Sequence, residues 1–379
     1  MPKNVEKFSL KDELFNAIKV EKIAEEIEAV YADFDARLFS NDTLSKFSEL
    51  ELKEHIYHIC DMLGMYLPND YLVATNILLK ALPPMLDTSK VDDDFGDFIY
   101  ASYSEYVATY GCVDEYLLFS LQALREITKR FSVEFAIRNF INLYPKETLA
   151  MLEQCTLSSN YHERRLASEG LRPKLPWAKK LTLDYHEALG HLDTLFYDKT
   201  RYVTRSVANH LNDIAKIDAP LVIDTLKRWK STGKQDEKEM EYITNHALRT
   251  LVKKGDADAL ALLGYKNSVA ISVSDLVFTS DVVLVGEALI FELEIEAKEV
   301  CKLVIDYLIH FRTKRDSLSL KVHKLKKLNL KKGEKVTLKK KHSFRANMST
   351  RTLYEGEHKI ELQINGRVYA SDSFILKTK

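Results

Sequence analysis

The sequence predicts an α solenoid of HEAT-like helical repeats over residues 1–264, followed by an all-β immunoglobulin-like sandwich over residues 265–379. Apolar residues recur at spacings of three and four from about Leu10 to Leu263, the period of an amphipathic helix, and glycine is scarce there. After Gly264 the pattern changes to short runs of β-branched and apolar residues, which indicate strands. The chain is therefore expected to hold two domains.

Four segments of the helical part look alike: EFAIRNFINL from Glu134, ERRLASEGL from Glu163, VTRSVANHL from Val203 and ITNHALRTL from Ile243. Aligning Ala167, Ala208 and Ala247 separates them by 41 and 39 residues. This spacing is close to the period of about 40 residues that HEAT-type helix pairs have. Antiparallel helix pairs stacked one on the next are the expected architecture.

The β part contains the runs VAISVSDLVF, ALIFELEIEA, KLVIDYLIHF and RVYASDSFIL. Near its end, KIELQI and RVYAS flank Asn365-Gly366, a dipeptide suited to a type I′ hairpin turn. About seven strands in roughly 110 residues are typical of an immunoglobulin-type sandwich. Only Cys301 lies in this part, so the usual disulfide between the two sheets cannot form.

Charge is distributed unevenly along a chain whose net charge is only −1. Residues 266–379 hold 22 Lys and Arg against 14 Asp and Glu, and the preceding residues hold 33 against 42. A contact with a polyanion would therefore depend on local basic surfaces and not on the field of the whole molecule.

Cysteine spacing and the terminal sequence bear on the compartment. The cysteines Cys60, Cys112, Cys155 and Cys301 lie too far apart for a structural zinc site or a secreted disulfide scaffold. The start MPKNVEKFSL lacks the apolar core of a signal peptide, and no run approaches the length of a membrane span. We expect a cytoplasmic protein with no membrane contact.

Common cofactor motifs are missing from the sequence. It has no phosphate-binding glycine loop, dinucleotide fingerprint or GxSxG elbow. The histidines of HEALGH, His186 and His191, are five residues apart instead of the four of a zinc-protease helix. We therefore expect neither a metal nor a nucleotide cofactor.

Two blocks place a carboxylate among basic residues: RRLASEGLRPKLPW at 164–177 and RSVANHLNDIAK at 205–216. A helical wheel of the second block puts Val207, Leu211 and Ile214 on one side. The polar residues Arg205, Asn209, Asp213 and Lys216 gather on the other. The wheel therefore predicts that Asp213 faces away from the core.

The first block has the same layout, because Arg165, Glu169 and Arg172 stand away from its apolar residues. Further back, Glu134 lies four residues before Arg138. Stacked repeats in register would bring Glu134, Glu169 and Asp213 to one concave surface. The alternative is that such pairs only decorate exposed helices and contribute a few tenths of a kcal/mol each; the pattern alone favours this second interpretation.

Two further features are open to two interpretations. Trp177 follows RPKLP, whose prolines hold the chain extended, and could pack against a sugar or base or fill a gap between repeats. The run HKLKKLNLKKGEKVTLKKKH, which includes Lys339, Lys340 and Lys341, suits two strands with one basic face toward solvent. Such a face could attract phosphates or protect a sheet edge from aggregation.

The blocks RFSVEFAIRNF, RRLASEGLRPKLPW, RSVANHLNDIAK and HALRTLVKKGDADALALLG closely resemble the AlkC family of bacterial DNA glycosylases. LKDELFNAIKVEKIAEEI and FGDFIYASYSEYVATYG are also similar to it, so the resemblance covers nearly the whole chain. The family consists of HEAT-like-repeat enzymes that remove alkylated bases, and one branch has a C-terminal immunoglobulin-like domain. The resemblance implies base excision repair on cationic lesions such as 3-methyladenine and 3-methylcytosine.

The resemblance places the family's acidic active-site residues on Glu134, Glu169 and Asp213. Two connections depart from the family pattern, SSNYHERR before the first block and KIDAP after the second. Both lie between helices, so they affect the expected loop geometry more than the chemistry.

A mechanism follows from the resemblance as a hypothesis. A cationic base leaves easily, so the oxocarbenium-like sugar is what needs stabilisation, and carboxylates beside Arg165, Arg172 and Arg205 would supply it. Asp213 would position or activate water with help from Glu169 and Glu134. Without an evident Schiff-base lysine, we expect a monofunctional enzyme that works as a monomer on double-stranded DNA.

Several residues are expected to contact this DNA. They are Arg138, Arg165, Arg172, Trp177, Arg205, Asn209 and Lys216 in the helical part, and Lys339, Lys340 and Lys341 in the β part. Whether the base is flipped from the helix stays open, because few aromatic side chains suit a flipped-base pocket. A non-catalytic HEAT-repeat scaffold that binds DNA or protein is the alternative function.

Overall fold

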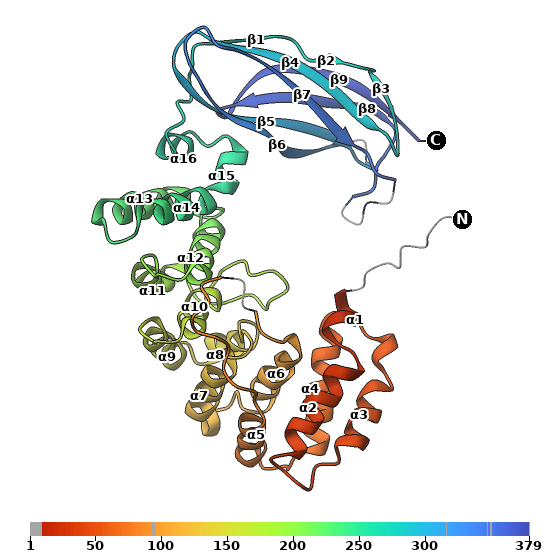
Figure 1. Ribbon diagram of the computed structural model, residues 1–379, viewed down its shortest axis with the longest axis vertical. Coiled ribbons are helices and arrows are strands. Elements are labelled where there is room, and N and C mark those ends of the chain that lie inside the picture. The colour runs from red at the N-terminus through yellow and green to blue at the C-terminus, as the bar shows by residue number, and fades with distance from the viewer. Residues whose placement is uncertain (1–9, 93–94, 316, 347, 349–350, 379) are drawn as a thin grey trace. The chain divides into compact units, whose positions relative to one another are not determined.

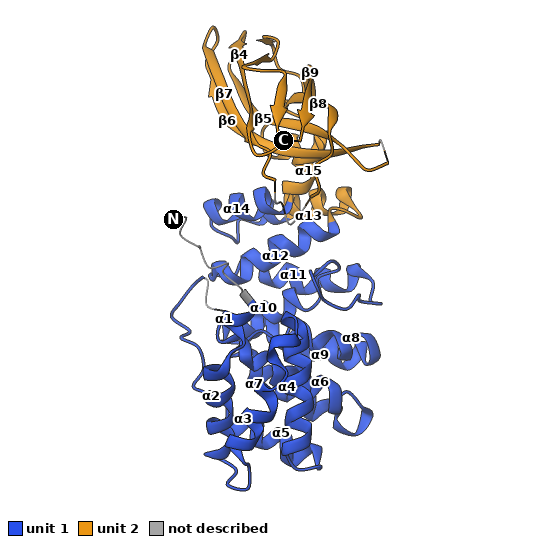
Figure 2. Ribbon diagram, turned by 90° about the vertical axis from the view of Figure 1, so that its right-hand side faces the viewer, with its two compact units in different colours: residues 1–214, 229–247 blue, residues 215–228, 248–379 orange. Residues whose placement is uncertain are grey.

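The computed structural model describes residues 10–92, 95–315, 317–346, 348 and 351–378. The chain divides into two compact units (Figure 2). Unit 1 comprises the residues up to Ile214 together with Trp229–Ala247, and unit 2 comprises Ala215–Arg228 and Leu248–Lys379.

The described residues before 263 form helices, as the apolar period predicts (Figure 1). The α-helices are α1 Leu10–Leu14, α2 Ala17–Glu28, α3 Ala36–Leu44, α4 Leu52–Tyr66, α5 Tyr71–Lys80, α6 Ala101–Tyr110, α7 Leu117–Thr128, α8 Ile137–Leu143, α9 Pro145–Thr156, α10 Tyr161–Glu169, α11 Leu189–Leu195, α12 Arg201–Ile214, α13 Ala219–Thr232, α14 Glu237–Ala247, α15 Arg249–Lys254 and α16 Ala257–Leu262. Short 3-10 turns lie at Phe47–Glu49, Phe98–Tyr100, Asp114–Tyr116 and Tyr185–Ala188. None of these helices is both long enough and apolar enough to cross a membrane.

Helices α10, α12 and α14 stack in succession within unit 1, and α9 and α11 pack beside them (Figure 1). The aligned alanines Ala167, Ala208 and Ala247 belong to these three helices and are completely buried. Small residues at equivalent positions let each helix approach the next closely. The predicted repeat of about 40 residues is therefore a real structural period.

The connection before α10 departs from the family pattern in sequence, yet it starts the helix in an ordinary way. The side chain of Asn160 accepts a hydrogen bond of 2.9 Å from the backbone N–H of His162. Asn160 has extended backbone angles and precedes Tyr161, the first residue of α10. It is therefore an N-cap, which satisfies a free N–H group of the first turn.

Unit 2 contains two β-sheets, one over the other as a sandwich. The strands are β1 Ile271–Val273, β2 Val277–Phe278, β3 Val282–Leu284, β4 Ala288–Ala297, β5 Cys301–Arg312, β6 Leu318–Leu330, β7 Lys335–Ser343, β8 Gly356–Ile364 and β9 Arg367–Lys377. One sheet has the order β3-β9-β8-β5-β6, and in the other β4 pairs with β1, β2 and β7. The three short strands β1 to β3 raise the count above the seven expected.

The predicted turn between the last two strands is confirmed. Asn365 and Gly366 have φ values of 47° and 82°, and Ile364 pairs with Arg367 across the hairpin. Positive φ at both central residues is what a type I′ turn requires.

Strand β5 is buried on both faces, unlike a strand with one face toward solvent. Leu303, Ile305 and Tyr307 enter the core between the sheets. On the opposite face, Val304 packs with Leu260 and Tyr265 in a second, smaller apolar cluster. The segment around α16 therefore covers the outer face of the five-stranded sheet.

Lys339 and Lys341 of β7 are exposed on one face, as predicted, whereas Lys340 departs from the prediction because it lies on the other face. Leu338, Lys340 and His342 alternate with exposed Lys339 and Lys341, and Leu338 belongs to the core between the sheets. Because successive side chains of a strand point to opposite sides, Lys340 lies on the inner face and the other two lysines lie on the outer face.

The chain changes from helix to strand between Leu262, the last residue of α16, and Ile271, the first residue of β1. The two compact units divide the chain elsewhere, with α15 and α16 in the unit that holds the sandwich. The division into domains 1–264 and 265–379 stays a prediction.

Gly255, which ends α15, provides a test of how that segment packs in unit 2. It has a φ of 76°, and an added Cβ would lie 2.8 Å from the Cα of Gly366. Gly255→Ala should lower the free energy of unfolding by about 1–2 kcal/mol for the left-handed backbone and by about 1–3 kcal/mol more for overpacking. Urea denaturation followed by circular dichroism would measure the change.

Gly264→Ala is the matched control, since Gly264 has a φ of 79° and its nearest neighbour is the Lys302 Nζ at 3.9 Å. Gly264→Ala should lower the free energy of unfolding only by the cost of the left-handed backbone. Equal losses in both variants would contradict the close contact between Gly255 and Gly366.

Candidate active site

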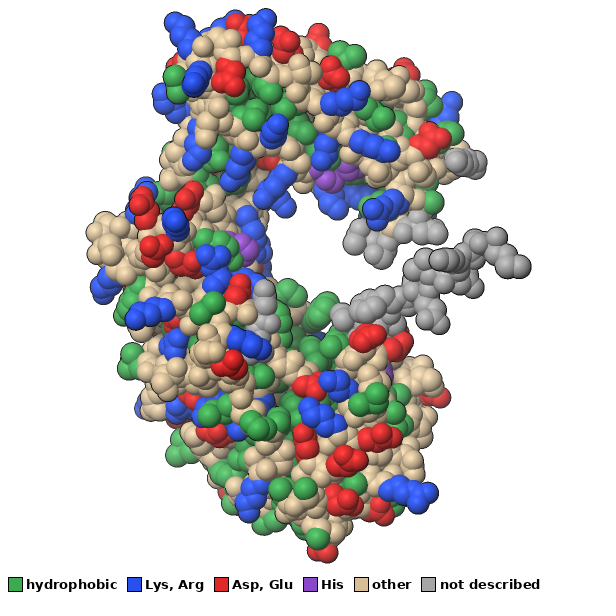
Figure 3. Space-filling model, viewed as in Figure 1, with side chains coloured by type: hydrophobic (Ala, Val, Ile, Leu, Met, Phe, Trp, Pro, Cys, Tyr) green, Lys and Arg blue, Asp and Glu red, His purple; other side chains and the backbone are tan. Residues whose placement is uncertain are grey.

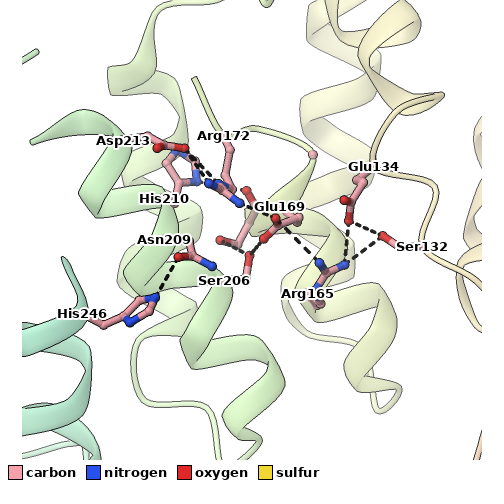
Figure 4. A network of polar contacts seen from close by, with 12 residues as sticks. Ser132, Glu134, Arg165, Glu169, Arg172, Ser206, Asn209, His210, Asp213 and His246 are labelled. Carbon is pink, nitrogen blue, oxygen red and sulfur yellow. Dashed lines mark hydrogen bonds and ion pairs between the residues drawn. The ribbon is translucent and has the colours of Figure 1, made fainter. Parts of the chain in front are cut away.

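Glu134, Arg165, Glu169, Arg172 and Asp213 form one chain of ion pairs with alternating charge (Figure 4). Arg165 contacts the carboxylate of Glu134 at 2.9 Å and that of Glu169 at 3.7 Å. Arg172 contacts Glu169 through Nη1 at 2.6 Å. The same guanidinium contacts Oδ2 of Asp213 through Nε at 3.0 Å and Nη2 at 2.9 Å. The three predicted carboxylates are therefore brought together.

Different elements supply the members of this network. Arg165 and Glu169 lie on α10, Asp213 lies in the last turn of α12, and Arg172 follows α10 directly. Glu134 lies in the turn before α8, not on a helix, and it pairs with Arg165 and not with Arg138, four residues on. Successive repeats thus contribute successive carboxylates.

Asp213 was predicted to face away from the core, but the structure buries it. The exposed fractions of the side chains of Glu134, Glu169 and Asp213 are 18%, 5% and 2%. Helix α12 packs against α10, α11 and α14, and the part of its polar side that carries Asp213 is covered, whereas Arg205 and Asn209 stay partly exposed. A buried charge requires a partner, and Arg172 provides it.

The charge state of Glu169 follows from its surroundings. Burial alone would raise its pKa, but Arg165 and Arg172 outweigh burial and hold the pKa below the ordinary value. The Ser206 hydroxyl donates a hydrogen bond of 2.5 Å to its Oε2 atom. Glu169 is therefore an anion at neutral pH, as predicted for a carboxylate beside these arginines.

His210 is buried next to the network and was missed by the sequence argument. Its Nδ1 lies 3.0 Å from the carbonyl oxygen of Ser168, so Nδ1 carries the proton. Burial first, and then the charge of Arg172, lower its pKa to about 4. The ring is thus neutral. Its position three residues before Asp213 on the same helix was the available signal.

Arg138 does not lie at a surface, so its predicted phosphate contact is wrong. It is 1% exposed and donates to the carbonyl oxygens of Lys179 at 2.6 Å, Gly170 at 3.0 Å and Arg172 at 2.9 Å. Burial and the charge of Arg172 lower its pKa to about 10. Arg138 therefore fixes the backbone of the segment that carries Arg172.

Arg165 and Arg172 also do not fit the predicted grip on phosphates. They are 9% and 7% exposed, and both bind the carboxylates described above. The ring of Tyr202 lies 4.5 Å from the guanidinium carbon of Arg165, a second partner that the sequence argument missed. Both arginines orient carboxylates in this structure.

The remaining predicted residues of the second block lie outside the network. Arg205 forms an ion pair with Asp92 and is partly exposed. Asn209 accepts a hydrogen bond of 2.8 Å from the Nε2 of His246, and Lys216 is exposed just after α12. The opposite charges of Arg205 and the acidic stretch near Asp92 could have suggested that pair.

Trp177 is 70% exposed, which excludes the interpretation that it fills a gap between repeats. Its φ is 62°, a left-handed conformation that is rare for a bulky residue. Its carbonyl accepts a hydrogen bond from Lys53, and Asn142 binds the backbone of Lys180 and Thr182, each at 2.9 Å. A fixed loop therefore presents an exposed indole.

His210 provides a test by pH. A histidine whose folded pKa is about 4, against an ordinary 6.5, contributes stability that is complete above pH 6.5 and is lost as pH falls toward 4. The free energy of unfolding should fall by roughly 3 kcal/mol once the pH has fallen to 4. His210→Asn keeps a donor for the Ser168 carbonyl and cannot titrate, so it should retain part of this stability. Urea denaturation at several pH values would measure it.

The exposed His186 is the control, because its Nδ1 contacts Asp184 on the surface, at 2.6 Å. His186→Asn should follow the wild-type curve. A His210→Asn curve parallel to wild type would show that His210 does not titrate as a buried neutral ring.

Comparisons with known proteins cover both parts of the chain. Residues 272–378 match the family model described as "Uncharacterised protein YhaZ, C-terminal Ig-like domain". The uncharacterized protein YhaZ of Bacillus subtilis (strain 168) is 33% identical over 368 residues, which are 96% of this chain and 98% of that protein.

A solved structure is similar over nearly the whole chain. It is the Pseudomonas fluorescens alkylpurine DNA glycosylase AlkC bound to DNA containing an abasic site analog, with a TM-score of 0.87 and 31% identity. The match covers 98% of this chain and 100% of that one. With its helical repeats, its sandwich and these relatives, the chain belongs to the AlkC family, in the branch with a C-terminal immunoglobulin-like domain.

Proposed function

We propose that the protein is a DNA glycosylase that removes alkylated bases from double-stranded DNA by hydrolysis of the N-glycosidic bond. The similarity to the AlkC glycosylase over 98% of the chain supports the reaction class. The ion-pair network of Glu134, Glu169 and Asp213 is the observation that carries the proposal, because it holds three carboxylates in one place.

The substrates would be cationic bases, such as 3-methyladenine and 3-methylcytosine, removed as the first step of base excision repair. Loss of a cationic base leaves an oxocarbenium-like sugar as the species to be stabilised. Carboxylates oriented in advance stabilise such a charge without the cost of reorganisation at the moment of reaction.

Each carboxylate has a proposed role. Asp213 lies beside the scissile bond and positions or activates water, and Glu169 and Glu134 assist. Arg172 binds both Glu169 and Asp213, so the two carboxylates keep a fixed separation. We expect a monofunctional enzyme that acts as a cytoplasmic monomer without a metal or nucleotide cofactor.

The contacts with DNA fall to the accessible residues of the predicted set. Arg205, Asn209 and Lys216 are partly or fully exposed, and Trp177 projects from its loop. A DNA phosphate would replace the carboxylate of Asp92 on Arg205, because both are anionic oxygen acceptors. Lys339 and Lys341 on the outer face of β7 stay candidates for weaker contacts, since Lys339 lies 4.0 Å from Glu292.

The carboxylates are tested by base release. Asp213→Asn and Glu169→Gln should each slow the release of 3-methyladenine and 3-methylcytosine from methylated DNA by about 100-fold or more, the usual effect of removing an electrostatic group of an active site. Single-turnover release of free base would be measured. Wild-type protein that releases no base would favour the alternative of a non-catalytic scaffold.

Glu163→Gln is the matched control, because Glu163 also lies on α10, is 3% exposed and pairs with Arg125 at 2.7 Å and Lys129 at 3.2 Å. It should lose stability and keep its release rate. If all three variants are slowed equally, the loss reflects folding and not the site.

Trp177 is tested by Trp177→Gly, which removes the indole and relieves the left-handed backbone. The free energy of unfolding should stay equal or rise by about 1 kcal/mol. DNA affinity should fall by about 1–3 kcal/mol if the indole packs against a nucleotide. Fluorescence anisotropy with a methylated duplex and urea denaturation would measure the two quantities.

Trp177→Phe should recover part of the affinity. A variant that loses stability but keeps its affinity for DNA would assign Trp177 to packing.

A further inference from the structure

Two histidines meet at one edge of the sandwich. His323 lies on β6 and His342 on β7, and their ring centroids are 4.7 Å apart. Tyr307 on β5 stacks on His323 at 5.0 Å, and its hydroxyl lies 2.9 Å from the Nδ1 of His342. β6 is the edge strand of the five-stranded sheet, and β7 belongs to the other sheet. The pair therefore lies where the two sheets face each other.

Four cations surround this pair. Lys321 and Lys340 each lie two residues before a histidine on the same strand, and so on the same face. Arg351 lies 3.7 Å over the ring of Phe311, and Lys253 comes from α15 of the same unit. Figure 3 shows histidine side chains at the surface of the sandwich beside lysines and arginines.

The histidines are neutral in these surroundings. Burial first, and then nearby positive charge, lower the pKa of each ring to about 4. For His342 the acting charges are those of His323 first and then of Lys340, Lys321 and Arg351; for His323 they are those of Lys321, Arg351, Lys253 and Lys340. No carboxylate is among these groups.

Some nitrogen atoms of the cluster have no partner in the described part of the chain. The Nε2 of His323 and the Nη1 of Arg351 are buried without a hydrogen bond. Burial raises the pKa of Tyr307 to about 12, so its hydroxyl keeps its proton and can donate it to Nδ1 of His342 when that nitrogen carries no proton. The Nε2 of His342 then carries the ring proton and is a donor. Buried polar nitrogens without a hydrogen-bond partner are unfavourable, so a ligand that offers acceptor atoms here would stabilise the cluster.

Charge decides which ligand fits. Two histidines and a tyrosine could also bind a transition metal, but four neighbouring cations repel a metal ion. An oxyanion is attracted by the same cations, and it stabilises the protonated form of each histidine. A phosphodiester group shares one negative charge between two non-bridging oxygens, and both accept hydrogen bonds from such donors.

We propose that His323, His342, Lys340 and Arg351 form a proton-linked binding site for a phosphodiester group of the DNA backbone. The inference rests on the proposed DNA-directed function and adds the place where unit 2 holds the backbone. Binding draws protons onto the histidines, so affinity increases as pH falls. Lys339 and Lys341, which point to the other face of β7, are not part of this site.

The first test observes the histidines of the wild-type protein. The full chain labelled with 15N would be titrated from pH 8 to 5 by NMR, with and without an undamaged 12-base-pair duplex. Because the pKa of each free ring is about 4, His323 and His342 of the free protein should keep their neutral-ring signals over this range, and with the duplex bound their midpoints should rise into it, to pH 5 or above. His310 is the control, because its Nε2 binds Glu361 at 2.9 Å, and its NMR signals should be the same with and without the duplex.

The second test measures affinity for the same duplex against pH. For each proton taken up, Kd should fall by up to tenfold per pH unit between the midpoint of the complex and that of the free protein. His323→Gln and His342→Gln should each flatten this dependence, and His310→Gln should keep it.

The outcomes separate this site from the proposed function. If the duplex binds while the midpoints of His323 and His342 stay in place, or if it does not bind, the site is refuted. Release of 3-methyladenine from methylated DNA, measured separately, decides the glycosylase activity. The NMR titration uses wild-type protein, so it decides the question even if a histidine variant fails to fold.

Discussion

Arg172 is the side chain on which the candidate active site depends. Its guanidinium binds Glu169 through one nitrogen and Asp213 through two others. These carboxylates belong to consecutive stacked helices, α10 and α12. One planar, permanently charged group therefore sets the distance between carboxylates that the chain supplies 44 residues apart.

Arg172 in turn depends on the backbone around it. Arg138 donates to the carbonyls of Gly170, Arg172 and Lys179, and these three bonds hold the segment after α10. The segment continues to Trp177, whose carbonyl is bound by Lys53. The buried carboxylates and the exposed indole are thus positioned by one set of backbone contacts. A substitution of Arg138 would therefore displace both the buried carboxylates and the exposed indole.

The buried ion pairs are costly, because charges lose hydration when they leave water, and apolar residues of equal volume often stabilise a core better. Stability alone therefore gives little reason for these buried ion pairs, which agrees with the catalytic role proposed for their carboxylates. The charged residues of the sandwich differ in the partners that they have. Glutamates of β4 oppose Lys335 and Lys339 on the outer face of β7, whereas Lys340 and Arg351 near the histidine pair have no carboxylate opposite them among the groups that act on the rings.

Features that depend on local periodicity could be predicted from the amino-acid sequence alone. Spacings of three and four predicted the helices, the alanines at 167, 208 and 247 predicted their stacking, and Asn365-Gly366 predicted the last hairpin. Family resemblance selected Glu134, Glu169 and Asp213. Tertiary structure decided which of these side chains are buried and which groups they pair with. A helical wheel separates polar from apolar sides, but it does not contain the neighbouring helices that cover the polar side. For the same reason the sequence pattern placed Arg138 at a surface, although it is buried. The contact between His323 and His342 could not be predicted either, because it forms between strands of two different sheets.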